Sequence, residues 1–264
     1  MKNIAITGAG GRMGKALMEA IASTDEMQLT VAIEHSGSSL IGADAGEIAG
    51  LGRNNIAVVS SLDELADSFD ILIDFSVPVA TVENAEFCRQ HGKKMVVGTT
   101  GLTTDQVQVV QQASEHTSIC MASNFATGVN LCFKLAELAA SVFGNNVDIE
   151  ISEAHHRHKV DAPSGTALML GQAAAEGRGV DLSNVEDRGR DGITGARKRG
   201  DIGFHAIRGG DVVGEHDVIF AADGERIVLR HLATDRQIFV RGALRAAIWG
   251  QGKDAGEYDM IDVL

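Results

Sequence analysis

The sequence predicts an α/β protein in which a doubly wound parallel sheet is joined to an α+β domain with a mostly antiparallel sheet. Three observations predict this architecture. Short β-branched runs alternate with longer helical patterns in the first half, which is typical of βαβ units. After Asn124, strand patterns are separated by short turns, which join antiparallel neighbours. The 264 residues, of which 44% are hydrophobic, suffice to bury a core in each domain.

The first half contains the alternating elements of the predicted parallel sheet. Strands are expected at 3–7, 29–34, 57–60, 71–75, 94–97 and 118–121. Helices are expected at 12–22, 62–68, 79–91 and 104–115. Two entry signals support these helices, because Ser61 suits a cap for the helix at 62 and Pro78 suits the first turn of the next helix.

The second half changes its pattern. A helix at 129–143 leaves little polar face, as expected for a buried connector between two domains. Strands are expected at 147–153, 202–208, 212–222 and 225–233, with turns at Gly209-Gly210 and at 222–225. Further helices are expected at 164–176 and 237–250. The patterns alone do not assign the last helix to either domain.

Composition argues against several classes of protein. The formal net charge of −13 repels polyanions, so nucleic acid is not an expected partner. The one basic stretch, residues 188–199, is interrupted by glycines and an aspartate and contains no aromatic residue for base stacking. Neither an apolar run of about 20 residues nor an export leader is recognisable, so no membrane is expected. The three cysteines, Cys88, Cys120 and Cys132, fit neither a disulfide framework nor a metal motif, which favours a cytoplasmic location.

A glycine-rich turn follows the first predicted strand and opens the first predicted helix. Gly8, Gly11 and Gly14 allow a tight turn and a close approach of the backbone to a pyrophosphate, which then meets the positive end of the helix. Glu34 ends the second strand, where a carboxylate can accept hydrogen bonds from ribose hydroxyls and repel a 2′-phosphate. Glycines of this kind can also serve helix packing alone. Strand, helix and acid together favour a Rossmann-like dinucleotide site.

Three other strand ends carry small or polar loops. These loops are residues 74–78, 98–101 and 122–128. Ligands of open parallel sheets bind beyond the carboxyl ends of the strands, so these loops could line one rim with N–H, hydroxyl and amide groups. Each loop taken alone is equally compatible with ordinary turn chemistry.

A cationic segment, His155-His156-Arg157-His158-Lys159, reverses the acidic character of the chain over five consecutive positions. A metal site, a solvated turn, and an acid–base and anion site are the competing interpretations. His156 and His158 could chelate, but no metal is expected, because no Asp, Glu or Cys stands at a familiar ligand spacing and Arg157 and Lys159 would repel a dication. Pro163-Ser164-Gly165-Thr166, which follows shortly after this segment, indicates a helix start with a proline in its first turn. A helix N-terminus beside cations is suited to bind a carboxylate. Histidine titrates near neutrality and suits proton donation.

With both motifs considered, the chain resembles the dihydrodipicolinate reductase family, the 4-hydroxy-tetrahydrodipicolinate reductases of bacterial diaminopimelate and lysine biosynthesis. The resemblance covers essentially the whole length. It is carried by the sequences GAGGRMG at 8–14, GTTG at 98–101, ASNF at 122–125 and, above all, EAHHRHKVDAPSGTA at 153–167.

The resemblance implies reduction by NADH or NADPH of a small dicarboxylate substrate, with loss of water. His155 matches the family's proton donor and acceptor and Lys159 its second proton donor, whereas His156, Gly165 and Thr166 match substrate-binding positions. The cofactor-binding positions carry over to Gly8, Ala9, Gly10, Gly11, Arg12, Met13, Glu34, His35, Gly98, Thr99, Thr100, Ala122, Ser123, Asn124 and Phe125. Arg157 and His158 receive no role.

The resemblance also implies the domain boundaries and the assembly. A dinucleotide-binding domain is expected at 1–126 and 237–264, and a substrate-binding and oligomerisation domain at 127–236. A homotetramer built through the second domain's sheet is expected. One departure concerns His35, where many members have an arginine that pairs with the 2′-phosphate of NADPH. We therefore expect NADH to be favoured.

Two other functions are weighed against this one. A semialdehyde dehydrogenase needs a cysteine nucleophile, and Cys120 is the one candidate near a strand end, although its apolar surroundings indicate a core residue. A redox-sensing NAD-binding protein would instead use the cationic segment to contact a partner.

Overall fold

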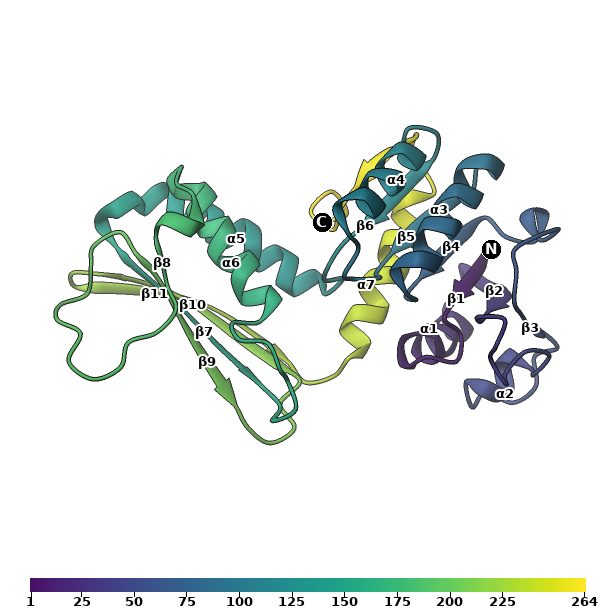
Figure 1. Ribbon diagram of the computed structural model, residues 1–264, viewed down its shortest axis with the longest axis horizontal. Helices are drawn as coiled ribbons and strands as arrows, with labels where there is room; N and C mark the ends of the chain where they lie inside the picture. Colours follow the sequence, from purple (N-terminus) through teal and green to yellow (C-terminus); the bar gives the residue numbers. More distant parts are fainter. The chain divides into compact units, whose positions relative to one another are not determined.

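The computed structural model describes residues 1–264, which form two compact units. Unit 1 comprises Met1–Ala126 and Gln237–Leu264, and unit 2 comprises Thr127–Arg236. The chain therefore completes most of unit 1, forms unit 2 and then returns to unit 1 for its last helix and strand. Each unit has its own sheet and is described separately (Figure 1).

Unit 1 contains a seven-stranded sheet in the order β12-β6-β5-β4-β1-β2-β3, and every pair is parallel. The strands are β1 (Lys2–Thr7), β2 (Met27–Ile33), β3 (Val58–Val59), β4 (Ile71–Asp74), β5 (Lys94–Val97), β6 (Ser118–Met121) and β12 (Gly256–Tyr258). The order reverses between β1 and β4, which is the position where ligands of doubly wound sheets bind. The predicted parallel sheet is confirmed.

Helices cover both faces of this sheet. They are α1 (Arg12–Ala22), α2 (Ala45–Ile48), α3 (Pro78–His91), α4 (Thr104–Ser114) and α7 (Gln237–Gly250). Ile71 and Ile73 of β4 belong to a core shared with α1 and α7, whereas Leu72 belongs to a second core shared with α3 and α4. Burial on both faces explains why the strands are continuous apolar runs. As expected, Pro78 occupies the first turn of α3.

The helix predicted at 62–68 is wrong. The segment is a turn followed by a short 3-10 helix, η1 (Ala66–Ser68). The hydroxyl of Ser61 accepts the Asp63 N–H at 3.0 Å, and Glu64 adopts a left-handed conformation with φ 65°. A local side-chain bond and a left-handed residue both compete with helix formation. The short elements β12 and α2 were not predicted.

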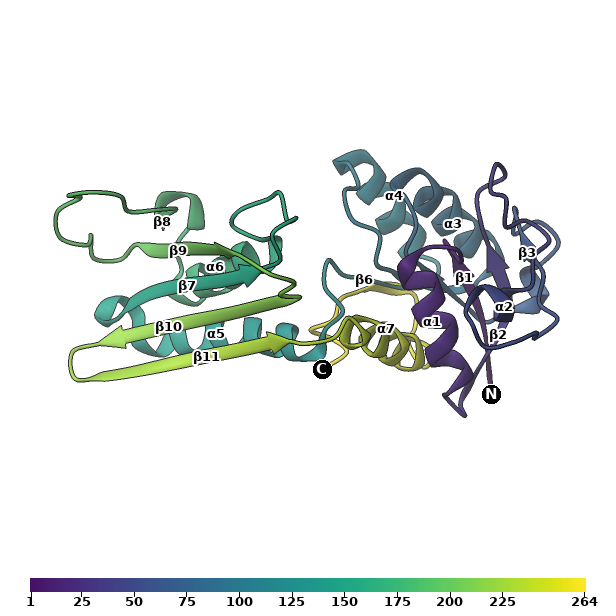
Figure 2. The ribbon, with the colours of Figure 1, turned by 90° about the horizontal axis from the view of Figure 1, so that it is seen from below.

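Unit 2 contains a five-stranded sheet in the order β11-β10-β7-β9-β8 (Figure 2). The strands are β7 (Asp148–His155), β8 (Glu186–Asp187), β9 (Ile202–Arg208), β10 (Gly214–Ala222) and β11 (Glu225–Ala233). The long pairings of β10 with β11 and of β10 with β7 are antiparallel, whereas β9 pairs in parallel with β7 and β8. The predicted α+β class is confirmed.

One predicted pairing in unit 2 is wrong. The Gly209-Gly210 turn was expected to join neighbouring strands, but β7 lies between β9 and β10. The turn reverses the chain without making a hairpin, because β7 offers one edge to each of these strands. The segment that links β7 to β9 contains α6 (Gly165–Arg178), so β7, α6 and β9 form a parallel crossover unit.

Two helices, α5 (Thr127–Phe143) and α6, pack on the sheet of unit 2. Gly171 of α6 is needed for this contact, because a Cβ there would lie 2.4 Å from the Phe204 ring. The short 3-10 helices η2 (Gly144–Asn146) and η3 (Leu182–Asn184) follow α5 and α6. The interpretation of α5 as a buried connector is wrong, because it leaves four apolar side chains exposed within unit 2: Leu131, Leu135, Leu138 and Val142. None of the helices has the length and apolarity needed to cross a membrane.

Candidate functional site

The residues predicted to bind a cofactor follow four parallel strands of unit 1. Residues 8–13 follow β1, Glu34 and His35 follow β2, residues 98–100 follow β5, and residues 122–125 follow β6. Because the strands are parallel, these segments share the carboxyl edge of one sheet, the edge at which ligands of such sheets bind.

The glycine turn has the geometry of an anion cradle. Gly8 adopts φ +71°, and a Cβ there would lie 2.8 Å from the Phe75 carbonyl oxygen. A Cβ on Gly14 would lie 2.2 Å from the Gly8 carbonyl oxygen, so only glycine lets α1 approach β1 this closely. No side chain caps α1 at Gly11, and its N-terminus therefore presents N–H groups to a ligand. These residues fit the pyrophosphate of a dinucleotide.

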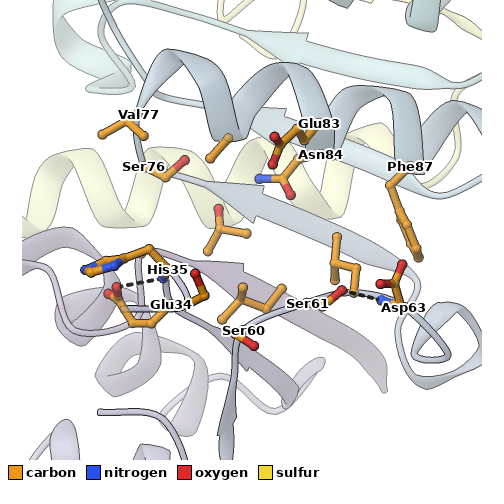
Figure 3. A pocket seen from close by; sticks show the side chains of 16 residues that line it. Glu34, His35, Ser60, Ser61, Asp63, Ser76, Val77, Glu83, Asn84 and Phe87 are labelled. Atoms are coloured by element: carbon orange, nitrogen blue, oxygen red, sulfur yellow. Dashed lines mark hydrogen bonds between the residues drawn. The ribbon is translucent and has the colours of Figure 1, made fainter. Parts of the chain in front are cut away.

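A cavity of about 670 Å³ lies at the carboxyl ends of β1, β2, β3 and β4 (Figure 3). Glu34 and His35 lie on one side of this cavity, and Asp63 lies on another. Glu34 is held by the Gly10 N–H, which donates to its Oε1 at 2.8 Å. The lining includes the carboxylates of Glu34, Asp63 and Glu83 and no lysine or arginine. Carboxylates in such a lining can accept hydrogen bonds from ribose hydroxyls.

The other two predicted cofactor loops do not line this cavity. They are instead connected to it through residues 75 and 76. Thr99 Oγ1 accepts the Ser76 N–H at 2.9 Å, and the Phe125 ring packs on the Phe75 ring with centroids 5.5 Å apart. A Cβ on Gly98 would lie 2.1 Å from the Phe75 ring. The structure thus divides the predicted cofactor residues into two neighbouring groups on one edge.

A buried carboxylate not singled out from the sequence anchors this edge. Asp74 ends β4 and is fully buried. Its Oδ1 accepts hydrogen bonds from Thr7 Oγ1, at 2.6 Å, and from Ser76 Oγ. These bonds tie the end of β1 to the loop after β4, between which the strand order reverses. A charged residue at the end of an otherwise apolar strand is the signal that could have identified it.

In unit 2, the cationic segment begins at the end of β7. His155 is its last residue, and the His155 Nδ1 lies 2.6 Å from Oε2 of Glu153. The Glu153 side chain is fully buried. Arg208 donates to both carboxylate oxygens at 2.7 Å, and the Ser164 N–H donates to Oε1 at 3.1 Å. Three elements, β7, β9 and the start of α6, therefore meet at one carboxylate.

The charge of Glu153 is maintained by its partners. Burial by itself raises the pKa of Glu153, but hydrogen bonds from Arg208 and His155, together with their charges, outweigh it and lower the pKa below its ordinary value. The group is therefore ionised at neutral pH.

Ser164 and His216 complete the buried side of this site. Ser164 Oγ accepts the Ala167 N–H at 3.2 Å and thereby caps α6, as the sequence indicates. The same oxygen lies 3.0 Å from Nε2 of His216. Burial, followed by the charge of His155, lowers the pKa of His216 to about 4, so this imidazole is neutral at pH 7. Pro163 was expected in the first turn of α6, but it precedes the Ser164 cap.

The predicted substrate and proton-transfer residues lie around this cluster in unit 2. Lys159 Nζ pairs with Asp161 Oδ1 at 2.8 Å, and the Lys159 N–H donates to the His156 carbonyl. The His156 side chain has a buried Nδ1 without a hydrogen-bond partner. Gly165 is the first residue of α6, and nothing lies within 4 Å of where its Cβ would be. An anion at this helix end would meet the positive dipole and nearby cations.

The structure also describes the candidate residues of a metal site and of the semialdehyde dehydrogenase alternative. No group of three or more histidine, cysteine, aspartate or glutamate side chains is placed to hold a metal ion. Burial, with smaller contributions from the charges of Asp259 and Asp262, raises the pKa of Cys120 to about 12. This thiol is therefore protonated at neutral pH and unsuited to act as a nucleophile.

The residues that sequence reasoning missed in unit 2 are Glu153, Arg208 and His216. Glu153 falls within the quoted motif, and its alternation with Ile149 and Ile151 places it on the buried face of β7. A carboxylate on a buried face needs a cationic partner, so this signal was available. Arg208 and His216 come from strands far along the chain and carry no such signal.

Replacing Arg208 with methionine is predicted to lower the free energy of unfolding by about 3–5 kcal/mol, because a buried carboxylate loses its bidentate partner. The pKa of Glu153 is lower in the folded chain than its ordinary value of 4.5, so the contribution of its charge is complete above pH 4.5 and is lost as the pH falls through the lowered value. The cost of Arg208→Met should therefore shrink in acid. Urea unfolding at several pH values measures it.

Arg190→Met is the matched control for this prediction. Arg190 pairs with Glu150, which lies on the same strand as Glu153. The Arg190 side chain is 31% exposed, and Arg197 also holds Glu150. Its replacement should cost less than about 1 kcal/mol. A pH-independent cost of Arg208→Met would show that compensation of the Glu153 charge is not its function.

Comparison with known proteins places this geometry in a family. The family model for the N-terminus of dihydrodipicolinate reductase matches residues 2–125, and the family model for the C-terminus of dihydrodipicolinate reductase matches residues 128–264. The 4-hydroxy-tetrahydrodipicolinate reductase of Pseudomonas fluorescens (strain SBW25) is 54% identical over 265 residues, which cover 100% of this chain and 99% of the relative. That of Ruegeria pomeroyi is 55% identical over 261 residues, which cover 99% and 97%.

A solved structure agrees with these matches. Dipicolinate-bound dihydrodipicolinate reductase from Paenisporosarcina sp. TG-14 superimposes with a TM-score of 0.81 and 28% sequence identity, and the match covers 100% of both chains. Family models, full-length relatives and fold thus agree, and the chain belongs to the dihydrodipicolinate reductase family.

Proposed function

We propose that this chain reduces 4-hydroxy-tetrahydrodipicolinate to tetrahydrodipicolinate, with loss of water, in diaminopimelate and lysine biosynthesis. It is an oxidoreductase of a family whose relatives carry this name over their full length. The observation that carries the proposal for the site is the cluster in which Glu153, itself held by Arg208 and the start of α6, contacts His155. In balance, the substrate loses one water and gains one hydride and one proton.

The reductant is a nicotinamide nucleotide, which supplies the hydride when bound. The proposed pyrophosphate site is the glycine turn at residues 8–13 with the N-terminus of α1. Glu34 is proposed to accept hydrogen bonds from the adenosine ribose, with its carboxylate already aligned by the Gly10 N–H. Residues 98–100 and 122–125 are proposed to hold the nicotinamide half, because they follow the neighbouring strands β5 and β6.

The substrate is a small dicarboxylate, in keeping with the dipicolinate held by the Paenisporosarcina relative. We propose that one carboxylate binds at the start of α6, at Gly165 and Thr166, where the helix dipole favours an anion. His156 is proposed to bind substrate as well, because its buried Nδ1 lacks a partner in the protein. Its cationic neighbours strengthen binding of an anion.

Two residues are proposed to handle protons. His155 acts as proton donor and acceptor through Nε2, since its Nδ1 is engaged by Glu153. Lys159 acts as a second proton donor, and Asp161 restrains its side chain. Positioned acids and bases of this type typically contribute about 100-fold to 10,000-fold in rate.

NADH is proposed as the favoured cofactor over NADPH. The 2′-phosphate of NADPH would enter a cavity lined by Glu34, Asp63 and Glu83. His35 is the one basic side chain in that lining, and the family resemblance places it at a position where an arginine was expected. Repulsion by carboxylates without a compensating guanidinium disfavours the extra phosphate.

A homotetramer assembled through the sheets of unit 2 is proposed. Val228 and Leu232 of β11 are 45% and 52% exposed, and their register partners place them on the opposite side of the sheet from His216 and Phe220. Ile207 of β9 is also exposed on this side. Exposed apolar side chains gathered on a sheet favour burial against another copy.

We also propose a cytoplasmic location, which suits three free cysteines.

The activity is tested by following NADH and NADPH oxidation with substrate generated in situ from pyruvate and aspartate semialdehyde by the preceding synthase. The wild-type chain should turn over, and His155→Ala and Lys159→Ala should each lower kcat by about 100-fold or more. His158→Ala is the matched control, because this exposed histidine of the same segment should leave kcat unchanged. No turnover with either cofactor would overturn the proposal and favour the redox-sensing alternative, whereas an active wild type with unaffected variants would overturn the proton-transfer roles of His155 and Lys159.

Cofactor preference is tested by steady-state kinetics of the wild type and of His35→Arg. The wild type should show a lower KM for NADH than for NADPH. A guanidinium at position 35 should raise kcat/KM for NADPH by about 10-fold to 150-fold, because a charge-assisted hydrogen bond to the 2′-phosphate is worth about 1.5–3 kcal/mol. His35→Gln should produce no such gain. A clear NADPH advantage in the wild type would contradict the proposal.

The oligomeric state is tested by size-exclusion chromatography with light scattering. The wild type should elute as a tetramer, and Leu232→Lys should shift it to smaller species because it places a charge in the apolar contact. Ile193→Lys is the control, since this fully exposed residue lies in a loop outside the strands. A monomeric wild type at micromolar concentration would refute the tetramer.

A further inference from the structure

We propose that Glu153 is a positioning residue for the reaction, which holds the imidazole of His155 in the Nδ1–H tautomer and makes Nε2 the atom that exchanges protons. This inference rests on the proposed function, which assigns proton transfer to His155. Glu153 lies on the buried side of His155 and acts through it.

The tautomer follows from the chemistry of the contact. The distance between His155 Nδ1 and Glu153 Oε2 is 2.6 Å. An ionised carboxylate can only accept hydrogen bonds, so the proton of this bond resides on the histidine nitrogen. Nε2 of a neutral ring is then the unprotonated nitrogen, and it becomes a donor when the ring is charged.

The carboxylate is itself rigidly held. Arg208 donates to both of its oxygens at 2.7 Å, and the Ser164 N–H donates to Oε1 at 3.1 Å. The Glu153 side chain is fully buried, whereas 12% of the His155 side chain is exposed. An orienting group with this many fixed partners can determine both the ring plane and the tautomer of the histidine it contacts.

Other groups around His155 do not duplicate this role. His216 on β10 meets the His155 ring edge-on, with centroids 5.1 Å apart, and remains neutral at pH 7. His231 on β11 is the register partner of His216. Lys159 is paired with Asp161, and Arg208 is paired with Glu153. Glu153 is thus the one carboxylate hydrogen-bonded to His155, and it stabilises the imidazolium when a proton is bound.

The experiment compares Glu153→Gln with Glu150→Gln. Glu150 lies on the same strand as Glu153 and is likewise held by cationic side chains, which are Arg190, Arg197 and His205. Both substitutions therefore remove a carboxylate that arginine holds, although Glu150 is 18% exposed and Glu153 is fully buried, and only Glu153 contacts His155. Glu153→Gln should lower kcat by about tenfold to 1,000-fold with a smaller change in KM, because an amide can turn its NH₂ toward Nδ1 and impose the other tautomer. Glu150→Gln should leave kcat unchanged.

The pH profile separates positioning from loss of folding. Without the carboxylate charge the imidazolium is less favoured, so the decline of kcat at alkaline pH should begin at lower pH in Glu153→Gln. Glu153→Asp keeps the charge but shortens the reach, and should lower kcat while leaving the alkaline decline nearer its wild-type position. Folded Glu153→Gln protein with the wild-type kcat and profile would overturn the inference, whereas an inactive wild type would instead overturn the proposed function.

The tautomer can also be measured in the wild type, without any variant. Nitrogen-15 NMR of His155 at alkaline pH should show a protonated Nδ1 and an unprotonated Nε2. The Nε2–H tautomer would overturn the inference. This measurement decides the question even if Glu153→Gln fails to fold.

Discussion

A buried carboxylate in unit 2 constrains both the fold and the chemistry around it. Moving an ionised glutamate out of water costs several kcal/mol unless cations and hydrogen-bond donors replace the lost hydration. For Glu153 these partners are Arg208 of β9, the Ser164 N–H at the start of α6, and His155 of β7 itself. The crossover unit of β7, α6 and β9 must therefore close with these groups in register. The same closure aligns His155 and brings the N-terminus of α6 to the site.

The two units use the same physical device for different ligands. In each, a helix begins directly after a strand or a loop of the site and presents backbone N–H groups, α1 at the glycine turn and α6 at Ser164. The surrounding charges then differ. Carboxylates dominate the unit 1 cavity, whereas His216 contacts the Ser164 cap of α6 and His155 shares Glu153 with it. These local side chains are the basis of the different ligand that is proposed for each helix end.

Helix starts could be predicted from the sequence where one local interaction determined the structure. Pro78, the Ser164 cap and the spacing of Gly8 and Gly14 each act through the nearest turn, and their helices begin within one residue of the predicted starts. The prediction failed at 62–68, where a hydroxyl bond to Asp63 and the left-handed Glu64 outweigh helix propensity. It also failed at Gly209-Gly210, because a turn specifies reversal of the chain but not which strand becomes the neighbour.

The cationic segment and the glycine turn were determined by the sequence itself, because both are continuous in the chain and each residue type has one chemistry to offer. Only the tertiary structure decided which partners these residues acquire. Arg208 reaches Glu153 across 55 positions, and His216 reaches Ser164 across 52. Such pairs depend on strand order and register, which emerge from packing a whole sheet against its helices rather than from the residues near each partner. The histidines, lysine and glycines of these segments thus predicted the candidate sites from the sequence, and the fold determined which nitrogen of His155 is available for proton transfer.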